Sequence, residues 1–79
     1  HKYIITELGS NMSKQIRNNI RRLRFDYDEM TQQNLADLVG VSRQTIVAIE
    51  KGKYSPSLEV AFKIASVFNK PFEEVFQYN

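Results

Sequence analysis

The tripeptide Gly40-Val41-Ser42 constrains the fold of this chain more than any other feature, because it separates two helix-forming segments. Thr31 and Ser42 are good N-cap residues, and each is followed by apolar residues at helical spacing. Gly40 is predicted to end the first of these helices in the left-handed conformation. So short a connection cannot join two long antiparallel helices, and a turn of this kind holds its helices at ~90–120°.

A first helix is predicted between the N-cap Ser13 and the carboxylates Asp26, Asp28 and Glu29. Its apolar stripe consists of Ile16, Ile20, Leu23 and Tyr27. Negative charge is unfavourable at the end of one helix and favourable at the start of the next, so these carboxylates separate the two helices. They could also be read as a metal or acid–base cluster, but no histidine stands near them and we favour the role at the helix ends.

Three further helices are expected in the second half of the chain. Gly52 ends the helix that Ser42 begins, and Ser57 caps a fourth helix after a short loop. The sequence Asn69-Lys70-Pro71 breaks that helix, and its proline opens a short fifth one. We expect no strand after residue 11. The sequence therefore predicts an all-α domain of five helices over residues 12–79.

Residues 1–11 differ in character from the rest of the chain. Tyr3, Ile4, Ile5 and Thr6 favour strands, Gly9-Ser10-Asn11 is typical of a turn, and Met12 is typical of a natural start. The segment is either a frayed or expression-derived tail, which we favour, or a short strand that pairs at the edge of a dimer.

Composition excludes several classes of protein. Seventy-nine residues fit a single domain. The absence of cysteine excludes disulfides and thiolate metal sites and suits a cytoplasmic location. No apolar run approaches the ~18 residues of a membrane span. The chain has no nucleophile–base pair, metal motif or glycine-rich phosphate loop, so we expect neither enzymatic activity nor a cofactor.

The net charge of +2 is unevenly distributed along the sequence. The stretches 14–24 and 43–53 together carry +7, so the remaining residues carry −5. Basic stretches of this kind are either solvated helix faces or the footprint of an anionic partner.

The outward face of the third helix has an unusual content for a solvated surface. Arg43, Val47 and Lys51 recur at a spacing of four residues, with Gln44 and Ala48 beside them. Small apolar groups permit close approach and can touch thymine methyl groups, while Arg reads guanine and Gln reads adenine. The start of a helix also attracts phosphate. This face is therefore a candidate for reading DNA.

The chain resembles the Xre or phage-repressor (Cro-like) helix-turn-helix regulators from about residue 16 to 78. The resemblance is carried by Gln32-x-x-Leu35-Ala36-x-x-x-Gly40-Val41-Ser42-Arg43-Gln44-Thr45-Ile46-x-x-Ile49-Glu50-x-Gly52-Lys53, then by Pro56-Ser57-Leu58 and Lys63-Ile64-Ala65. The first link, residues 25–30, departs from the family because it is one residue longer and lacks the usual glycine. That departure leaves the pose of the first helix open.

The resemblance implies a five-helix lambda-repressor-like fold, with helices two and three as the helix-turn-helix, and it assigns roles to particular residues. Contacts to DNA bases are implied for Arg43, Gln44, Val47 and Ala48. Contacts to the DNA backbone are implied for Gln32, Ser42, Lys51, Lys53 and Tyr54. A structural ion pair is implied between Arg24 and Glu50. Other readings stay open, with Ser42 as a helix cap only, Gln32 as a plain exposed residue and Tyr54 as a loop-packing residue.

Aromatic residues near the C-terminus exceed what so thin a core is expected to hide. A dimer surface is therefore expected at Phe68, Phe72, Phe76 and Tyr78. The resulting hypothesis is a small bacterial or phage repressor-like regulator of transcription that binds specific double-stranded DNA as a homodimer, with helix 43–51 in the major groove. The alternative is a protein-interaction module, such as an antitoxin or adapter, that binds a protein partner through this aromatic face.

Overall fold

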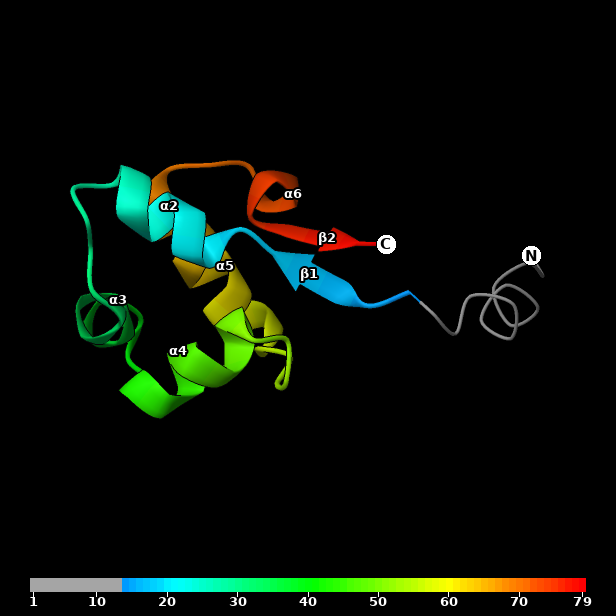
Figure 1. Cartoon of the computed structure of the whole chain (residues 1–79), viewed down its shortest axis with the longest axis horizontal. Coiled ribbons are helices and arrows are strands. Elements are labelled where there is room, and N and C mark those ends of the chain that lie inside the picture. Colours follow the sequence, from blue (N-terminus) through cyan, green and yellow to red (C-terminus); the bar gives the residue numbers. More distant parts are fainter. Residues whose placement is uncertain (1–13) are drawn as a thin grey trace.

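The structure, a computed structural model, describes residues 14–79, which form five helices and one two-stranded antiparallel sheet (Figure 1). The elements in chain order are β1 (Ile16–Asn18), α2 (Ile20–Asp26), α3 (Gln32–Val39), α4 (Arg43–Glu50), α5 (Leu58–Phe68), α6 (Phe72–Val75) and β2 (Phe76–Tyr78). The predictions for residues 1–11 and for the cap Ser13 lie outside the described residues. Within them, no helix is long and apolar enough to cross a membrane.

The expectation that no strand follows residue 11 is wrong. The helix predicted from Ser13 begins only at Ile20, and residues Ile16–Asn18 instead pair with Phe76–Tyr78. Gln15 and Asn79 exchange two backbone hydrogen bonds (3.0 and 3.1 Å), which extend the ladder by one pair. The fifth helix is correspondingly shorter than expected and ends at Val75. Pairing between residues some sixty positions apart leaves no mark in local periodicity, which explains the error.

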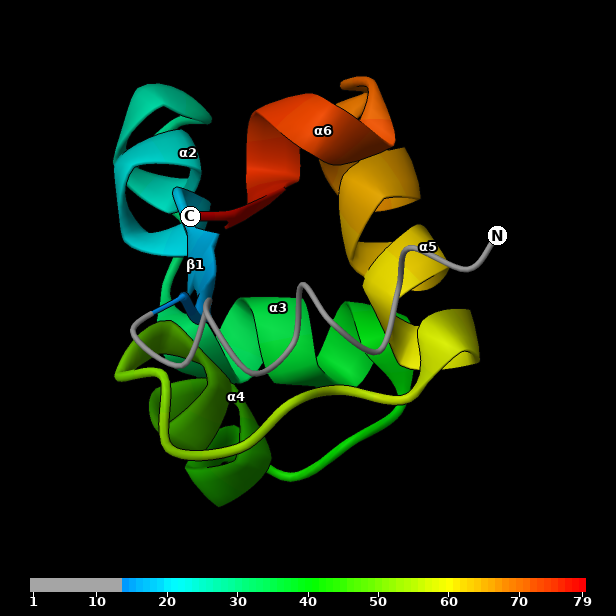
Figure 2. The same cartoon turned by 90° about the vertical axis from the view of Figure 1, so that its right-hand side faces the viewer.

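The helices enclose a single core of aliphatic and aromatic side chains, and α2, α5 and α6 surround it above α3 and α4 (Figure 2). Ile20 of α2, Leu35 of α3 and Ile46 of α4 are fully buried there, as are Ile64 of α5 and Val75 of α6. Each helix thus contributes at least one fully buried side chain. At ~1.5–3 kcal/mol for each such side chain, this burial is the main stabilising contribution to the fold.

The predicted helix boundaries around the short turn are confirmed. Thr31 Oγ1 accepts a hydrogen bond from the Asn34 N–H (2.9 Å), and Ser42 Oγ accepts one from the Thr45 N–H (3.1 Å). Gly40 ends α3 in the left-handed conformation, with φ of 80°. This conformation costs an L-residue about 1–2 kcal/mol and costs glycine little, so Gly40 fixes the direction in which α4 leaves the turn.

The link between α2 and α3 places two consecutive residues other than glycine in the left-handed region. Asp28 has φ of 60° and Glu29 has φ of 52°. Aspartate tolerates this region because its short side chain hydrogen-bonds locally, whereas glutamate has no such advantage. This is the link in which the sequence lacks the glycine usual among the proteins it resembles.

We predict that Glu29→Gly raises the free energy of unfolding by about 0.5–1 kcal/mol, because it removes the left-handed strain at an exposed position. Urea denaturation followed by circular dichroism measures the change. The same substitution in a helix, Glu59→Gly in the first turn of α5, is the control and is expected to lower stability by about 1 kcal/mol. Equal effects of the two variants would contradict the role assigned to φ at Glu29.

Candidate nucleic-acid interface

One face of α4 is buried and the opposite face is open to solvent. Ile46 and Ile49 pack in the core, with exposed fractions of 0% and 2%. Arg43 and Gln44 are exposed at the start of the helix, and Val47 and Ala48 are half-buried one turn later. The four residues expected to contact bases therefore lie on the accessible side of a single helix. Their side chains form a surface that is polar at the start of the helix and carries short apolar groups one turn later.

The residues expected to contact the DNA backbone lie at both ends of α4 and at the start of α3. Ser42 caps α4, and its hydroxyl also lies 2.9 Å from that of Thr45. At the other end, Lys51, Lys53 and Tyr54 are exposed. The chain is fixed there by Gly52, whose φ is 75°, and by a hydrogen bond from the Lys53 N–H to the Ala48 carbonyl oxygen (2.9 Å). The two lysines consequently project from a defined turn.

The guanidinium of Arg24 joins α2 to α4. Its Nε and Nη2 donate to Glu50 Oε2 and Oε1 at 2.6 and 3.0 Å, and its Nη1 donates to the Met30 carbonyl oxygen at 2.9 Å. The side chains of Arg24 and Glu50 are only 14% and 7% exposed. The structure thus brings together the two residues that the sequence paired, and it adds a third contact to the α2–α3 link.

Gln32 belongs to the same network. Its Nε2 donates to Glu50 Oε1 at 3.1 Å, so the first residue of α3 is tied to the last residue of α4. Sequence reasoning missed this contact, having read Gln32 either as a phosphate ligand or as a plain exposed residue. An amide has two N–H donors, so one hydrogen of Gln32 remains for a second acceptor.

A polar groove of about 620 Å³ runs along α4 between the end of α2 and the start of α3. Because Arg24 and Glu50 neutralise each other, the remaining charged residues that line it are Arg21, Arg43, Lys51 and Glu29. Three positive charges against one negative favour an anionic occupant. Arg21 was absent from the site predicted from the sequence. Its position three residues before Arg24, on the same side of α2, was the available signal.

Comparison with known proteins agrees with this geometry. The Helix-turn-helix family model matches residues 29–75, which is more than half of the chain. The chain belongs to the Xre-like helix-turn-helix family of DNA-binding transcriptional regulators.

Its relatives in this helix-turn-helix family include bacterial and archaeal proteins. An uncharacterized HTH-type transcriptional regulator of Archaeoglobus fulgidus is 53% identical over 81% of this chain and 90% of its own length. The cryptic phage CTXphi transcriptional repressor RstR of Vibrio cholerae is 39% identical over 71% of this chain and 50% of its own. A solved Bacteroides fragilis structure, named as a candidate DNA-binding protein, matches 80% of this chain and all of its own with a TM-score of 0.68 and 25% identity.

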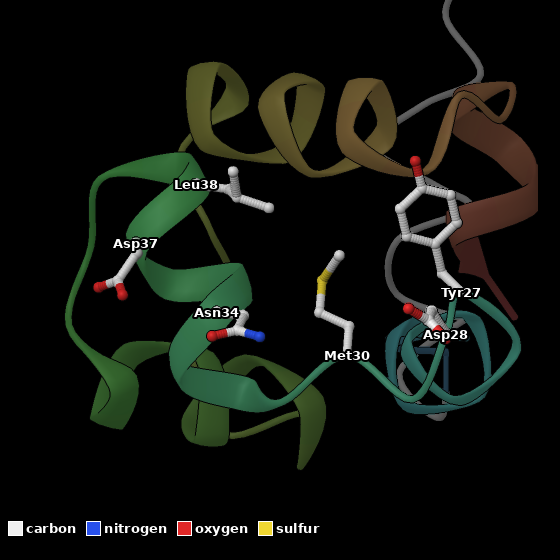
Figure 3. A pocket seen from close by; sticks show the side chains of 6 residues that line it. All are labelled: Tyr27, Asp28, Met30, Asn34, Asp37 and Leu38. Atoms are coloured by element: carbon white, nitrogen blue, oxygen red, sulfur yellow. The ribbon is translucent and has the colours of Figure 1, made fainter.

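On the other side of α3, the surface of the helix-turn-helix domain carries negative instead of positive charge. A hollow of about 390 Å³ is lined by residues of α3 and of the α2–α3 link, and Met30 and Leu38 point into it (Figure 3). Its lining includes the carboxylates of Asp28 and Asp37 and no basic side chain. The charge of this hollow is therefore opposite in sign to that of the groove along α4, and it disfavours an anionic occupant.

The aromatic surface expected on this domain is only partly present. Phe68 and Phe76 are 4% and 6% exposed and belong to the core, which corrects their assignment to a dimer surface. Phe68 is turned inward at the end of α5, where its ring meets that of Tyr27, and β2 directs Phe76 toward the core. Phe72 is half-buried, and Tyr78 is 55% exposed.

We predict that Glu50→Ala lowers the free energy of unfolding by about 3 kcal/mol, because it leaves the largely buried guanidinium of Arg24 without its partner. Glu50→Gln retains hydrogen-bond acceptors and is expected to cost less. Urea denaturation of both variants gives the values.

The control is Glu59→Ala, which removes the partner of Lys63 from a pair of 3.2 Å whose side chains are 78% and 51% exposed. A loss below about 1 kcal/mol is expected there. Equal losses at Glu50 and Glu59 would show that the Arg24 pair does not carry the stability assigned to it.

Proposed function

We propose that this regulator binds specific double-stranded DNA sequences as a homodimer, that α3 and α4 form its helix-turn-helix, and that it represses transcription. The observation that carries the proposal is the outer face of α4. Exposed Arg43 and Gln44 at its start are followed by half-buried Val47 and Ala48, and Arg43 and Val47 line the polar groove.

Each part of this face suits one feature of the major groove. Arg43 can donate two hydrogen bonds to guanine, and Gln44 can pair in the same bidentate manner with adenine. Val47 and Ala48 have no long side chain to hold the helix away from the bases, and their methyl groups suit contact with thymine. In helix-turn-helix proteins the N-terminal residues of the second helix contact base edges, which is where Arg43 and Gln44 lie.

The residues around α4 are suited to contacts with the phosphates. Lys51 and Lys53 supply positive charge at the end of the helix, and Tyr54 supplies an exposed hydroxyl beside them. Ser42 lies at the start of the helix, and Gln32 keeps one N–H donor beyond its bond to Glu50. Phosphate contacts of this kind set the register of a protein on DNA, whereas base contacts set its specificity.

Repression and dimerisation rest on separate arguments. RstR is named as a transcriptional repressor and matches this chain over 71% of its length, which supports the same activity here. A homodimer would bind two half-sites about 34 Å apart, one turn of the DNA helix. Burial of Phe68 and Phe76 weakens the alternative of an adapter that binds proteins through an aromatic face.

We predict that Gln44→Ala lowers the ratio of specific to random DNA affinity by about 10- to 100-fold, corresponding to one lost base contact of ~1–3 kcal/mol. The specific duplex is first obtained by selection from a random library, and fluorescence anisotropy then measures both affinities. Asn34→Ala is the matched control, because Asn34 is an exposed amide on α3 that lines the acidic hollow of Figure 3 and not the groove along α4. An unchanged ratio for Gln44→Ala would contradict base reading by this residue.

Lys53→Ala is expected to lower DNA affinity without changing the ratio of specific to random binding, unlike Gln44→Ala. Loss of one phosphate contact weakens specific and random binding alike and reduces the slope of log affinity against log salt by about one. Anisotropy titrations at several salt concentrations measure the slope. Lys70→Ala removes another exposed lysine, beyond the end of α5, and should leave the slope unchanged. A selective loss of specific binding in Lys53→Ala would contradict a backbone contact.

A further inference from the structure

An apolar groove lies at the hairpin end of the molecule, apart from the DNA-reading face. It has a volume of about 510 Å³ and is lined by Ile16 and Tyr78 of the two strands, Pro56 and Leu58 before and at the start of α5, and Phe72 of α6. No charged side chain lines it. The reading of DNA by α4 makes no use of this groove.

The groove is bordered by large apolar side chains in contact with water. Ile16 is 45% exposed, Tyr78 is 55% exposed, and Leu58 is 68% exposed. Single exposed apolar residues are ordinary on a protein surface, but a group of them around one hollow is typical of an interaction site. We propose that this groove is where a second copy of the chain docks, so that the hairpin of each protomer packs against the groove of its partner. The proposal rests on the homodimeric DNA binding proposed above.

The edges of the hairpin favour a second copy as the occupant. Gln15 and Asn79 form a hydrogen-bonded pair, so the next pair, Ile16 and Tyr78, directs its backbone N–H and C=O groups away from the hairpin. Within residues 14–79 the sheet has only these two strands, so both edges are open. A two-stranded sheet is marginal on its own and gains from further packing. In a dimer with a two-fold axis, both protomers gain the same additional packing on their sheets.

The charged residues near the groove are arranged so that two copies of the chain can attract each other. Lys14 lies on the β1 side, with its Nζ 5.8 Å from the centroid of the Tyr78 ring, whereas Glu73 and Glu74 follow Phe72 in α6. In Figure 2, which looks onto this end of the molecule, β1 lies on one side and α6 and α5 lie on the other. A two-fold axis running between them sets the basic rim of each protomer against the acidic rim of its partner. Opposed rims of this kind favour the correct partner and register.

The same axis places both DNA-reading helices correctly. In Figure 1 the hairpin projects from the right end of the molecule and α4 lies along the lower side. Rotation about a vertical axis at the right end keeps both copies of α4 on the lower side, as one face of DNA requires.

Asn18 connects the proposed interface to α4. Its Nδ2 donates to the Ile49 carbonyl oxygen at 2.9 Å, and its Oδ1 accepts from the Ile20 N–H at 3.1 Å. Docking through the hairpin therefore fixes the separation of the two α4 helices.

The first experiment is sedimentation equilibrium of the full chain at micromolar concentrations. The wild type is expected to have about twice the protomer mass of 9.2 kDa. Leu58→Glu should raise the dimer dissociation constant about 30-fold or more, the loss typical of a central interface residue. Glutamate suits the first turn of a helix, and Leu58 lies outside the core, so the protomer should stay folded.

The matched control is Leu38→Glu, because Leu38 is 61% exposed on α3 and borders the hollow of Figure 3 instead. This variant should dimerise like the wild type. Tyr78→Glu, at the other side of the groove, is a second interface variant and should dissociate as Leu58→Glu does. Circular dichroism verifies the fold of each variant.

Three results would overturn the proposal: a monomeric wild type, a dimer that survives in both folded interface variants, or a dimer lost only in Leu38→Glu. If the wild type is a monomer and Leu58→Glu lowers its thermal stability, the occupant of the groove is the chain's own N-terminal segment.

Binding to DNA separates this proposal from the proposed function. Leu58→Glu should keep wild-type affinity for a duplex with a single half-site and should lose the additional affinity for a duplex with two. If the wild type dimerises through the groove and binds no selected duplex, the proposed function fails and the interface stands. If Leu58→Glu is monomeric and binds the two-site duplex as tightly as the wild type, the interface stands, and the homodimeric DNA binding of the proposed function fails.

Discussion

One largely buried ion pair, between Arg24 and Glu50, joins the last residue of α4 to α2. Arg24 reaches from α2 across the α2–α3 link to Glu50 at the last residue of α4, and Gln32 of α3 shares the same carboxylate. The core alone would let α4 rotate or slide slightly, because apolar contacts have no direction. A bidentate guanidinium–carboxylate pair has a defined geometry, and a lysine at Arg24 could not reproduce it. Three helices are thereby held to one carboxyl group, directly behind the surface assigned to DNA.

The rest of the molecule is divided among three faces of different chemistry. The α4 side has a polar groove with excess positive charge, the far side of α3 has a hollow with two carboxylates, and the hairpin end has a groove without charge. A net charge of only +2 gives no indication of this separation. The two proposed contacts, with DNA at the α4 side and with a second copy at the hairpin end, therefore use different faces and do not compete.

Local signals in the sequence predicted local structure well. Thr31, Ser42 and Gly40 specify the ends of α3 and α4 through hydrogen bonds to near neighbours, so their pattern alone placed the turn. The strand at Ile16 depends on a partner at Tyr78, and the burial of Phe76 depends on that same pairing, so neither could be read from spacing. The contact of Gln32 with Glu50 is non-local in the same sense. The contacts with DNA assigned to α4 remain predictions.

The hairpin also determines when, during synthesis of the chain, the two strands β1 and β2 can pair. Helices α2 to α5 have nearby caps or core partners, so they can begin to form while the chain is still being synthesised. Strand β1 is made early but has no partner until Tyr78 has emerged from the ribosome, because the two strands are separated by nearly the whole domain. A chain from which Tyr78 has not yet emerged therefore lacks the strand pair on which the proposed docking of a second copy depends. The proposed interface is thus completed later in synthesis than the capped turn between α3 and α4.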